Sequence, residues 1–501
     1  MKKLIAILLL MSLLLMCGCQ RTGKDGNPLK IAKNGTVTAQ VNGEKVVFKP
    51  WKEAGLPTSG DYYLTKDVAL TAGVELTGDL RLCLRGHNIT VEKGAKFPNL
   101  ISVPAGMGLT LFDVGENAGT VVAGESFNSK VGTVSCIAAH GKVLLEGINM
   151  DATNIHLDDI ASGLCVYLHE GAEMTMNGGR MTGGINWNGK DFTGEEETPY
   201  MGDGGCLYVG KGAVCYINGA TLTSGSAARG GNIFVAGDSE KKGKLVIKDS
   251  VITEGESLYS GGNIYVQGEF EMDNTTLSAG ESYGHGGNIF VSGKLVINSG
   301  IITDGKADIN GKQGRKGGNI SINGLEADVY INNAKILNGK AETKEDYGGN
   351  IGIHGEGARS FLMENSELKG GVGHRGGNFY IGHISKEINP ENLDYTLNNV
   401  IMSEGTTTYR GTNICLDSNY EDDTINLTMN QCQMLATEDS GTDNIAVGAG
   451  AEDITYCNIV MNGGKVTGGV LTIYGKGTLT TNGTEIPFND HGGSGTLTVN
   501  P

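Results

Sequence analysis

The string GGNIFVAG, which starts at Gly230, is the first full copy of a motif that returns through the second half of the chain. Further copies are GGNIYVQG from Gly261, GGNIFVSG from Gly286, GGNISING from Gly317, GGNIGIHG from Gly348 and GGNFYIG from Gly376, followed by the degenerate GTNICLDS from Gly411 and TDNIAVGA from Thr442. Upstream, GGCLYVG at Gly204 and GLCVYLH at Gly163 carry Cys in place of Asn. The asparagines recur every 25 to 35 residues, and a period of this length predicts a protein of stacked repeats.

A second string in each repeat has two apolar residues around a variable one and then, typically, Asn. Examples are LVIN ending at Asn298, VYIN at Asn332 and LTMN at Asn430, and four residues later comes another apolar side chain. Each repeat therefore contains three short runs of alternating apolar and polar residues, which is the pattern of strands rather than helices. Connections this short leave no room for a crossover helix, so we expect an all-β fold, a single-stranded parallel β-helix with three short strands per coil.

Stacking explains which residues the repeat uses. Inward positions should form columns of Ile, Val, Leu and Met shared between neighbouring coils. The Asn positions should form a buried column in which each side-chain amide bonds the amides above and below it and also backbone groups. The adjacent Gly supplies a positive φ where the chain turns sharply.

Composition and charge limit the possible partners. The chain has 501 residues, a formal charge of −17 and a pI near 5.0, which argues against nucleic acid because phosphate binding needs a basic face. Eight cysteines remain beyond residue 19, none in the C-x2-C spacing of a zinc site, so we expect no metal centre there and mostly buried thiols.

The N-terminal sequence predicts a secretion signal. Residues 1–18 have a positive start and a short apolar run, as in a secretory signal peptide. The junction Met16-Cys17-Gly18-Cys19 resembles a bacterial lipobox, and the resemblance implies that Cys19 becomes the lipidated N-terminal residue. The alternative is an ordinary signal peptide without lipid. We expect residues 19–35 to be a flexible tether that holds a secreted protein at the outer face of the cell membrane.

The remaining chain divides into an N-terminal cap at 36–59, the parallel β-helix at 60–485 and a C-terminal end or cap at 486–501. The run LCLRGHNIT from Leu82 resembles the start of many right-handed β-helix proteins of the pectate-lyase-like superfamily, including surface proteins of Gram-positive anaerobes. The resemblance implies a right-handed coil and says little about activity.

Two columns are candidate sites. The residue between the inward Ile and Val of each motif should point outward, and this position is often aromatic: Tyr167, Tyr208, Phe234, Tyr265, Phe290 and Tyr380. Such rings could stack on sugars, or on one another to stabilise the sheet. Three residues before each Asn stands a second column that includes Arg229, His285, Lys316, Arg375 and Arg410, which could hold acidic groups or be paired with neighbouring carboxylates.

Catalysis is the competing hypothesis, since enzymes are common on this fold. A polysaccharide lyase needs a base beside a group that neutralises a uronate, and Lys316, His285 and Arg375 are the candidates. The acidic run from Asp417 to Asp423 resembles the opening of a Ca²⁺ loop but lacks Gly at its sixth place, so no cofactor is expected and Ca²⁺ is the weaker alternative. We therefore expect an adhesin-like, lipid-anchored surface protein that binds glycans or surface proteins laterally, with a polysaccharide lyase or hydrolase and a ligand-free scaffold as alternatives.

Overall fold

The computed structural model describes residues 31–41, 43–95, 97–113, 118–124, 134–155, 162–185, 202–308, 316–341, 346–384, 393–417, 424–436, 443–448, 456–487 and 492–501. Throughout these ranges the regular structure is β-strand, arranged in sheets of 30, 14 and 7 strands. The predicted all-β class with long parallel sheets of repeated strands is thus confirmed. None of these ranges contains a helix of the length and apolarity needed to cross a bilayer. The signal peptide, Cys19 and most of the tether lie outside the described residues.

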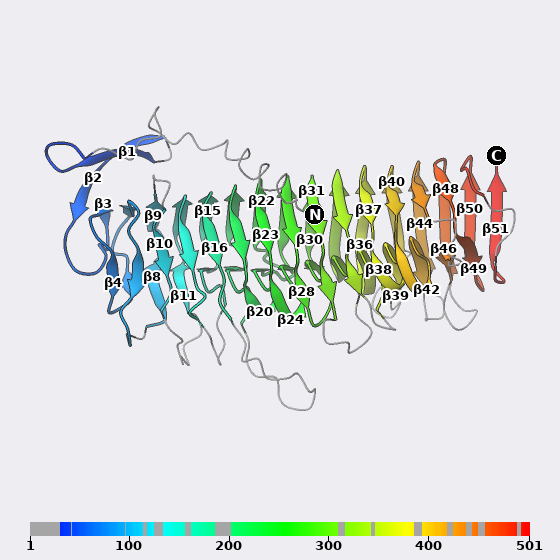
Figure 1. The fold of residues 1–501 in the computed structure, drawn as a ribbon, viewed down its shortest axis with the longest axis horizontal. Coiled ribbons are helices and arrows are strands. Elements are labelled where there is room, and N and C mark those ends of the chain that lie inside the picture. Colours follow the sequence, from blue (N-terminus) through cyan, green and yellow to red (C-terminus); the bar gives the residue numbers. More distant parts are fainter. Residues whose placement is uncertain are drawn as a thin grey trace, which may run out of the picture.

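The 30-stranded sheet contains two stacks of parallel strands that run the length of the molecule (Figure 1). The first stack, here the motif stack, holds the Asn-containing motif. It consists of β5 (Val74–Glu75), β8 (Asn99–Val103), β11 (Ser135–Ala139), β14 (Val166–Leu168), β17 (Leu207–Val209), β21 (Ile233–Val235), β25 (Ile264–Val266), β29 (Ile289–Val291), β33 (Ile320–Asn332), β36 (Ile351–Glu364), β39 (Phe379–Ile384), β43 (Ile414–Asp417), β46 (Asp443–Val447) and β49 (Val470–Ile473).

The second stack holds the strings in which two apolar residues flank a variable one and Asn typically follows. β33 and β36 run through both stacks without a break. Its other members are β2 (Glu44–Trp51), β3 (Gly60–Leu64), β6 (Leu80–Cys83), β9 (Gly108–Phe112), β12 (Lys142–Glu146), β15 (Glu173–Asn177), β18 (Val214–Asn218), β22 (Lys244–Lys248), β26 (Glu269–Asp273), β30 (Lys294–Ile297), β40 (Leu393–Asn398), β44 (Thr424–Asn430), β47 (Tyr456–Asn462), β50 (Thr478–Asn482) and β51 (Thr496–Asn500).

The 14-stranded sheet holds the apolar residue that follows each of these strings. Its members are β4 (Val68–Leu70), β7 (Ile89–Val91), β10 (Thr120–Val122), β13 (Asn149–Asp151), β16 (Arg180–Thr182), β19 (Thr221–Thr223), β23 (Val251–Thr253), β27 (Thr275–Ser278), β31 (Gly300–Thr303), β34 (Ala334–Leu337), β37 (Glu367–Lys369), β41 (Ile401–Ser403), β45 (Gln433–Leu435) and β48 (Lys465–Thr467).

A fourth strand in the central repeats departs from the expected three per repeat. It forms the 7-stranded sheet of β20 (Ser226–Arg229), β24 (Glu256–Ser260), β28 (Glu281–Ser282), β32 (Lys306–Ala307), β35 (Lys340–Ala341), β38 (Val372–Arg375) and β42 (Thr406–Arg410). Several of these strands are only two residues long, too short for an alternating pattern to reveal them. They pair because the stacked repeats bring equivalent residues into register, such as Glu256 with Glu281.

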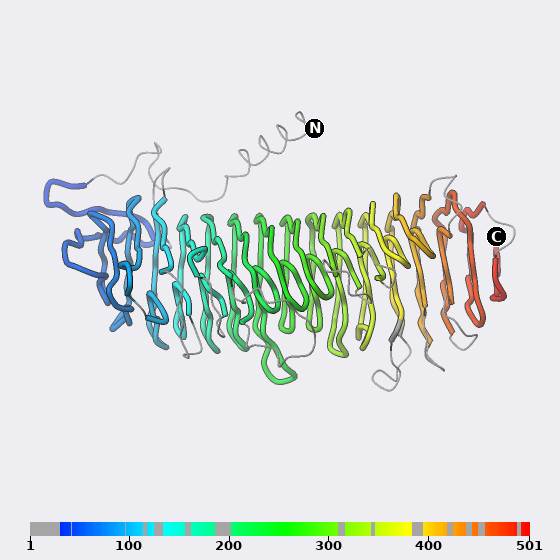
Figure 2. Tube along the Cα trace, turned by 60° about the horizontal axis from the view of Figure 1, so that its bottom comes forward, coloured from blue at the N-terminus to red at the C-terminus, as the bar shows by residue number. Residues whose placement is uncertain are grey.

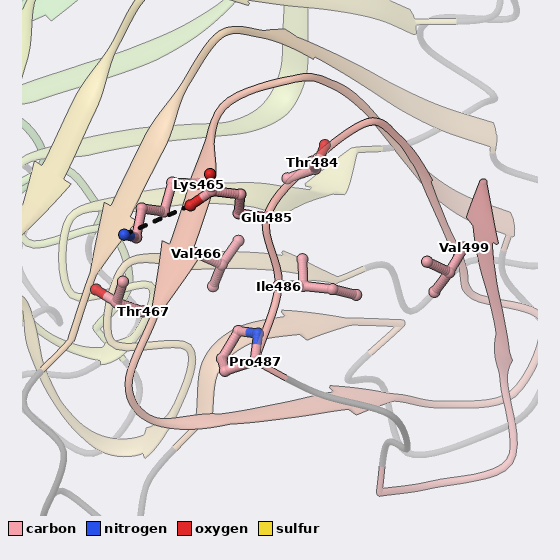
Figure 3. A pocket seen from close by; sticks show the side chains of 8 residues that line it. All are labelled: Lys465, Val466, Thr467, Thr484, Glu485, Ile486, Pro487 and Val499. Atoms are coloured by element: carbon pink, nitrogen blue, oxygen red, sulfur yellow. Dashed lines mark ion pairs between the residues drawn. The ribbon is translucent and has the colours of Figure 1, made fainter. Parts of the chain in front are cut away.

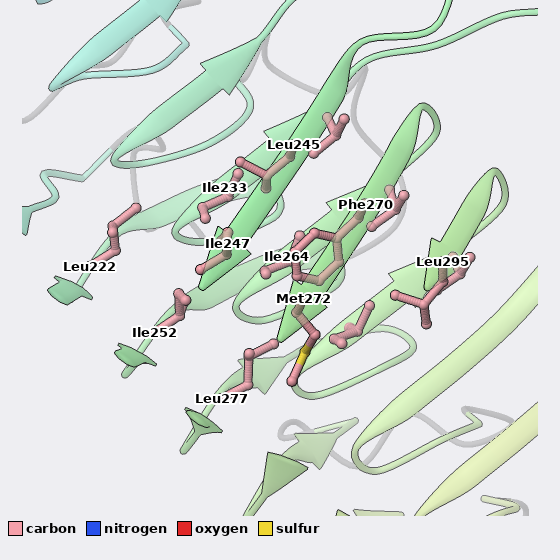
Figure 4. Close-up of a cluster of buried hydrophobic side chains, with 14 of the residues drawn as sticks. Leu222, Ile233, Leu245, Ile247, Ile252, Ile264, Phe270, Met272, Leu277 and Leu295 are labelled. Carbon is pink, nitrogen blue, oxygen red and sulfur yellow. The ribbon is translucent and has the colours of Figure 1, made fainter. Parts of the chain in front are cut away.

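Inward side chains of all the stacks form one apolar core from Leu56 to Leu479. Figure 4 shows its central part, where Ile233, Leu245 and Ile252 come from three successive strands of one repeat and pack against the same positions of the next. Parallel register keeps like residues above one another, as with Ile233 and Ile264. Figure 2 shows the repeats side by side in chain order from one end of the molecule to the other.

A ladder of eight asparagines runs through this interior, as predicted. Asn232, Asn263, Asn288, Asn319, Asn350, Asn378, Asn413 and Asn444 are fully buried. In the first seven, Nδ2 donates to the Oδ1 of the next asparagine at 2.6 to 2.8 Å and also to a backbone carbonyl. Nδ2 of Asn444, the last, donates to the carbonyls of Thr467 and Gly468. The ladder therefore satisfies polar groups that would otherwise be costly to bury.

The two glycines of the motif are needed for different reasons. The first has a positive φ, for example 70° at Gly261. The second packs against backbone: a Cβ at Gly262 would lie 2.0 Å from the carbonyl oxygen of Gly287. A third glycine, such as Gly305, donates its N–H to the Oδ1 of a ladder asparagine.

Both ends of the stack differ from its middle. At the N-terminal end β1 (Val37–Val41) pairs antiparallel with β2, and β2 pairs parallel with β3. This hairpin lies within the predicted cap at 36–59 and packs its apolar side on Tyr63, Cys83, Phe112 and Leu144. At the other end β51 joins β50 as one more parallel strand.

Candidate functional site

Five aromatic residues stack along the outer side of the motif stack, and we call them the aromatic column: Tyr167, Tyr208, Phe234, Tyr265 and Phe290. Successive ring centroids are 4.5, 5.3, 5.3 and 4.7 Å apart, with nearly parallel planes. Because each ring face covers the next, mainly the ring edges are left for solvent. Phe234 and Phe290 are buried, whereas the three tyrosines are partly exposed, and burial raises the pKa of all three.

Small residues interrupt the column after Phe290, and histidines fill the space. Ser321 and Gly352 occupy the next two positions in register. The buried His354 lies within hydrogen-bond distance of Ser321, with 2.9 Å between Nε2 and Oγ, and its ring centroid is 4.5 Å from that of His285. This arrangement packs the gap rather than opening it.

Tyr380, which the sequence placed on an outward and accessible surface, is fully buried. Its ring stacks on Tyr347 at 4.8 Å and packs with Cys415 and Ala446 in a small cluster outside the main core. The alternation correctly gave its direction away from the main core. It could not show that neighbours in the flanking repeats cover the ring.

The second candidate column lies directly beside the aromatic one, and we call it the cation column: Arg229, Ser260, His285, Lys316, Tyr347, Arg375 and Arg410. Its cations lie over rings. Arg229 is 4.7 Å from the centroid of Phe234, Lys316 is 5.2 Å from that of Tyr347, and Arg410 is 3.8 Å from that of Tyr474. The two columns that the sequence suggested separately thus form one surface, stabilised by cation–π contacts.

Buried carboxylates neutralise much of the charge in this surface. Arg229 forms a bidentate pair with Asp203, at 2.9 and 2.6 Å, and Arg375 pairs with the fully buried Asp417. Burial raises the pKa of Asp203, although the bonds from Arg229 oppose the shift. Asp443, half-buried near Arg410, also has its pKa raised by burial.

Sequence reasoning missed these acidic partners. Asp203 stands three residues before Cys206, the residue that replaces the ladder Asn in its repeat, so it occupies the same column as Arg229 one repeat earlier. Extending the cation column into the Cys-containing copies would have found it. Asp417 is the last residue of the motif strand β43, and no repeat signal marks it because its equivalents are residues such as Ala236 and Gly382.

The three catalytic candidates are only partly brought together. The backbone N–H of Lys316 donates to Nδ1 of His285 at 3.1 Å, so these two residues are neighbours. Arg375 lies further along the column, with Tyr347 between it and Lys316, and its guanidinium is engaged by Asp417. This geometry offers no single point at which a base and a free guanidinium meet.

Two surface hollows lie away from these columns. One, of about 720 Å³, is lined by Lys465, Val466, Thr467, Thr484, Glu485, Ile486, Pro487 and Val499 near the C-terminal end, with the Lys465–Glu485 ion pair at its side (Figure 3). The other, of about 490 Å³, is formed by residues 90–95, 122–124 and Asn154. Neither includes a residue of the aromatic or cation column.

In the described ranges, no three His, Cys, Asp or Glu side chains are grouped so as to hold a metal ion. Asp417, the first residue of the acidic run, pairs with Arg375, and the rest of that run to Asp423 lies outside the described residues. All eight cysteines beyond residue 19 are buried. Their burial was expected from the sequence.

No protein-family model, curated protein or solved structure matches this chain. Function must therefore be inferred from the chain's own geometry.

Proposed function

We propose that this chain is a lipid-anchored, adhesin-like cell-surface protein, which binds glycans or surface proteins through the combined aromatic and cation columns. Its body would be a right-handed parallel β-helix held away from the membrane by the tether. The single observation that carries the proposal is the grouping of stacked rings and cations on one side of the motif stack. One group runs from Tyr167 to Phe290, with Arg229 over its rings. Beyond the packed gap at Ser321 and Gly352, a second group has Arg410 over Tyr409 and Tyr474.

A stiff spacer is supported by the parallel register of the stacks. From β3 to β51 the second stack advances by fifteen strand-to-strand steps of about 4.8 Å, or about 70 Å in all. One continuous core links these steps, and the buried asparagine ladder reinforces those from Asn232 to Asn444, so we expect the protein to behave as a rod rather than as a chain of domains.

Binding is favoured over catalysis by the shape and charge of this surface. A lyase must hold a base and a charge-neutralising group at one point, yet Arg375 is paired with Asp417 and lies apart from Lys316 and His285. An extended row of ring edges and paired charges instead suits a long or repetitive partner, since it offers many weak contacts in one line.

The binding proposal is tested with the mature chain carrying Cys19→Ser, applied to a glycan array and to affinity gels. Tyr265→Ala should weaken retention at least fivefold, because it removes the ring between Phe234 and Phe290. Tyr216→Ala is the matched control, since Tyr216 is 44% exposed in the second stack. Equal retention of both variants would count against ligand binding by the aromatic column. An unsaturated uronate product released from acidic polysaccharides would replace the proposal with the lyase alternative.

Anchoring is tested separately by metabolic labelling with a palmitate analogue in a bacterial host. The wild-type chain should carry the label in the membrane fraction, and Cys19→Ser should not. Label that persists in Cys19→Ser would place any lipid on another residue.

A further inference from the structure

Two arginine–aspartate pairs in the cation column differ in one respect. In the first, Arg229 uses both Nε and Nη2 to reach the two carboxylate oxygens of Asp203. That pair is closed, because both oxygens and the inner edge of the guanidinium are engaged. Its carboxylate is largely buried, and its arginine side chain is 37% exposed.

The second pair is left half open. Arg375 reaches Oδ2 of Asp417 through Nη1 alone. Within the described chain, neither Nε of Arg375 nor Oδ1 of Asp417 has a hydrogen-bond partner, although both atoms are buried. Leaving a buried donor and a buried acceptor unused is unfavourable, and such groups call for an explanation.

We propose that this half-open pair is a binding subsite for a hydroxyl group of a neutral sugar. A hydroxyl can accept one hydrogen bond and donate another. It could therefore accept from Nε–H of Arg375 and donate to Oδ1 of Asp417, which would satisfy both atoms at once. The inference rests on the proposed binding function and names its ligand class.

The surroundings favour a neutral sugar over a uronate. The Arg375 guanidinium lies 5.3 Å from the ring centroid of Tyr347 and 5.2 Å from that of Tyr409. Tyr347 is buried, whereas Tyr409 is 44% exposed, so a ligand arriving from solvent meets Tyr409 first. An aromatic ring beside a hydroxyl-binding pair suits the mixed apolar and polar surface of a sugar. An acidic group would face the Asp417 carboxylate, with the charge of Arg375 already engaged.

The charged and titratable groups around Tyr409 belong to several strands. His374 stacks on its ring at 5.1 Å, and Arg410 lies 4.6 Å from its centroid.

Gly382 stands in register with Asp417, and a Cβ there would come within 2.6 Å of the Tyr380 hydroxyl. The glycine thus leaves room for a buried phenol beside the open pair.

The test uses the mature Cys19→Ser chain and affinity electrophoresis in gels containing a β-1,3-glucan, a mannan, a galactan or polygalacturonate. Asp417→Asn should weaken binding to a neutral polysaccharide at least tenfold, because the amide changes the acceptor presented to the hydroxyl. Asp61→Asn is the matched control and should stay within twofold of the parent, because Arg81 binds both oxygens of Asp61 in the second stack, outside the two columns. Far-ultraviolet circular dichroism and the melting temperature verify that each variant is folded.

A second pair of variants decides the question if Asp417→Asn does not fold. Arg375→Lys keeps the positive charge and removes Nε, and Tyr409→Ala removes an exposed ring. Both should weaken binding to the neutral polysaccharide at least fivefold.

The possible outcomes separate the subsite from the wider proposal. Retention by a neutral polysaccharide with losses confined to the Asp417, Arg375 and Tyr409 variants supports the subsite. Retention unaffected by these variants overturns the subsite alone, as does salt-sensitive retention by polygalacturonate only. Retention by none of the polysaccharides or of the array glycans overturns the subsite and removes the glycan-binding form of the proposed function.

Discussion

Removing one amide from the middle of the asparagine ladder should cost far more than removing one from the surface. Asn319 takes part in four hydrogen bonds: its Oδ1 accepts from Asn288 and from the Gly305 N–H, and its Nδ2 donates to Asn350 and to the Leu337 carbonyl. Asn319→Ala leaves two buried donors without an acceptor. At about 1 to 3 kcal/mol for each unsatisfied buried group, the loss is about 2 to 6 kcal/mol.

Asn430→Ala provides the matched control. Asn430 belongs to a second ladder at the edge of the second stack, bonded to Asn398 and Asn462 at 2.8 Å each. Its side chain is partly exposed, so water can replace both bonds. We expect a loss below about 1 kcal/mol, as for most surface substitutions.

Hydrogen exchange is the suitable assay, because long repeat arrays do not always unfold in one step and a single unfolding free energy can then mislead. The Gly305 amide should exchange at least about tenfold faster in Asn319→Ala, which corresponds to about 1.4 kcal/mol of local stability. Urea unfolding supplies the global comparison. If Asn319→Ala and Asn430→Ala lose equal stability and leave the Gly305 amide equally protected, the ladder does not hold the repeats together.

Three further predictions follow from burial. Ile264→Ala should lower the free energy of unfolding by about 2 to 5 kcal/mol, while Val251→Ala, whose side chain is 39% exposed, should change it little; comparable losses in urea titrations would contradict the inward assignment. Burial raises the pKa of Cys136 to about 12, so iodoacetamide at pH 8 should leave this thiol unmodified until denaturant is added, as peptide mass spectrometry can show. Burial and the stacked His140 lower the pKa of His169 to about 4, so the unfolded chain binds more protons between about pH 6.5 and 4. Stability should therefore fall as the pH drops through that range, and His169→Gln should flatten this part of the melting-temperature profile; an unchanged slope would show that His169 contributes nothing.

The sequence predicted the repeating strands and the ladder because both depend on spacing within one repeat. Inward positions such as Ile233 and Val235 follow from alternation, and Asn232 follows from its constant place between glycine and an apolar residue. The two-residue strand Lys306–Ala307 could not be foreseen, since it exists only through its neighbours in adjacent repeats.

The candidate site was harder to predict because exposure depends on contacts between repeats. Alternation places Phe234 and Tyr380 outside the main core. Phe234 is nevertheless buried by the rings of Tyr208 and Tyr265 and by Arg229. Tyr380 is buried by the ring of Tyr347 and by Cys415. Likewise, the basic residues of the column are visible in the sequence, whereas the carboxylate of Asp417 that pairs with Arg375 lies 42 residues further on and has no periodic counterpart. Whether the site binds a ligand remains a prediction.

The hydrogen bonds of the asparagine ladder all run in one direction, and this allows whole repeats to be removed or added. Each inner asparagine of the ladder donates one bond to its C-terminal neighbour and accepts one from its N-terminal neighbour, so successive repeats present the same pair of groups to each other. Excising the 25 residues from Gly261 to His285 would bring Ser260 directly before Gly286, and Asn232 would then meet Asn288. Unequal recombination between such similar segments would therefore shorten or lengthen the molecule by whole repeats and leave the bonding of its interior unchanged.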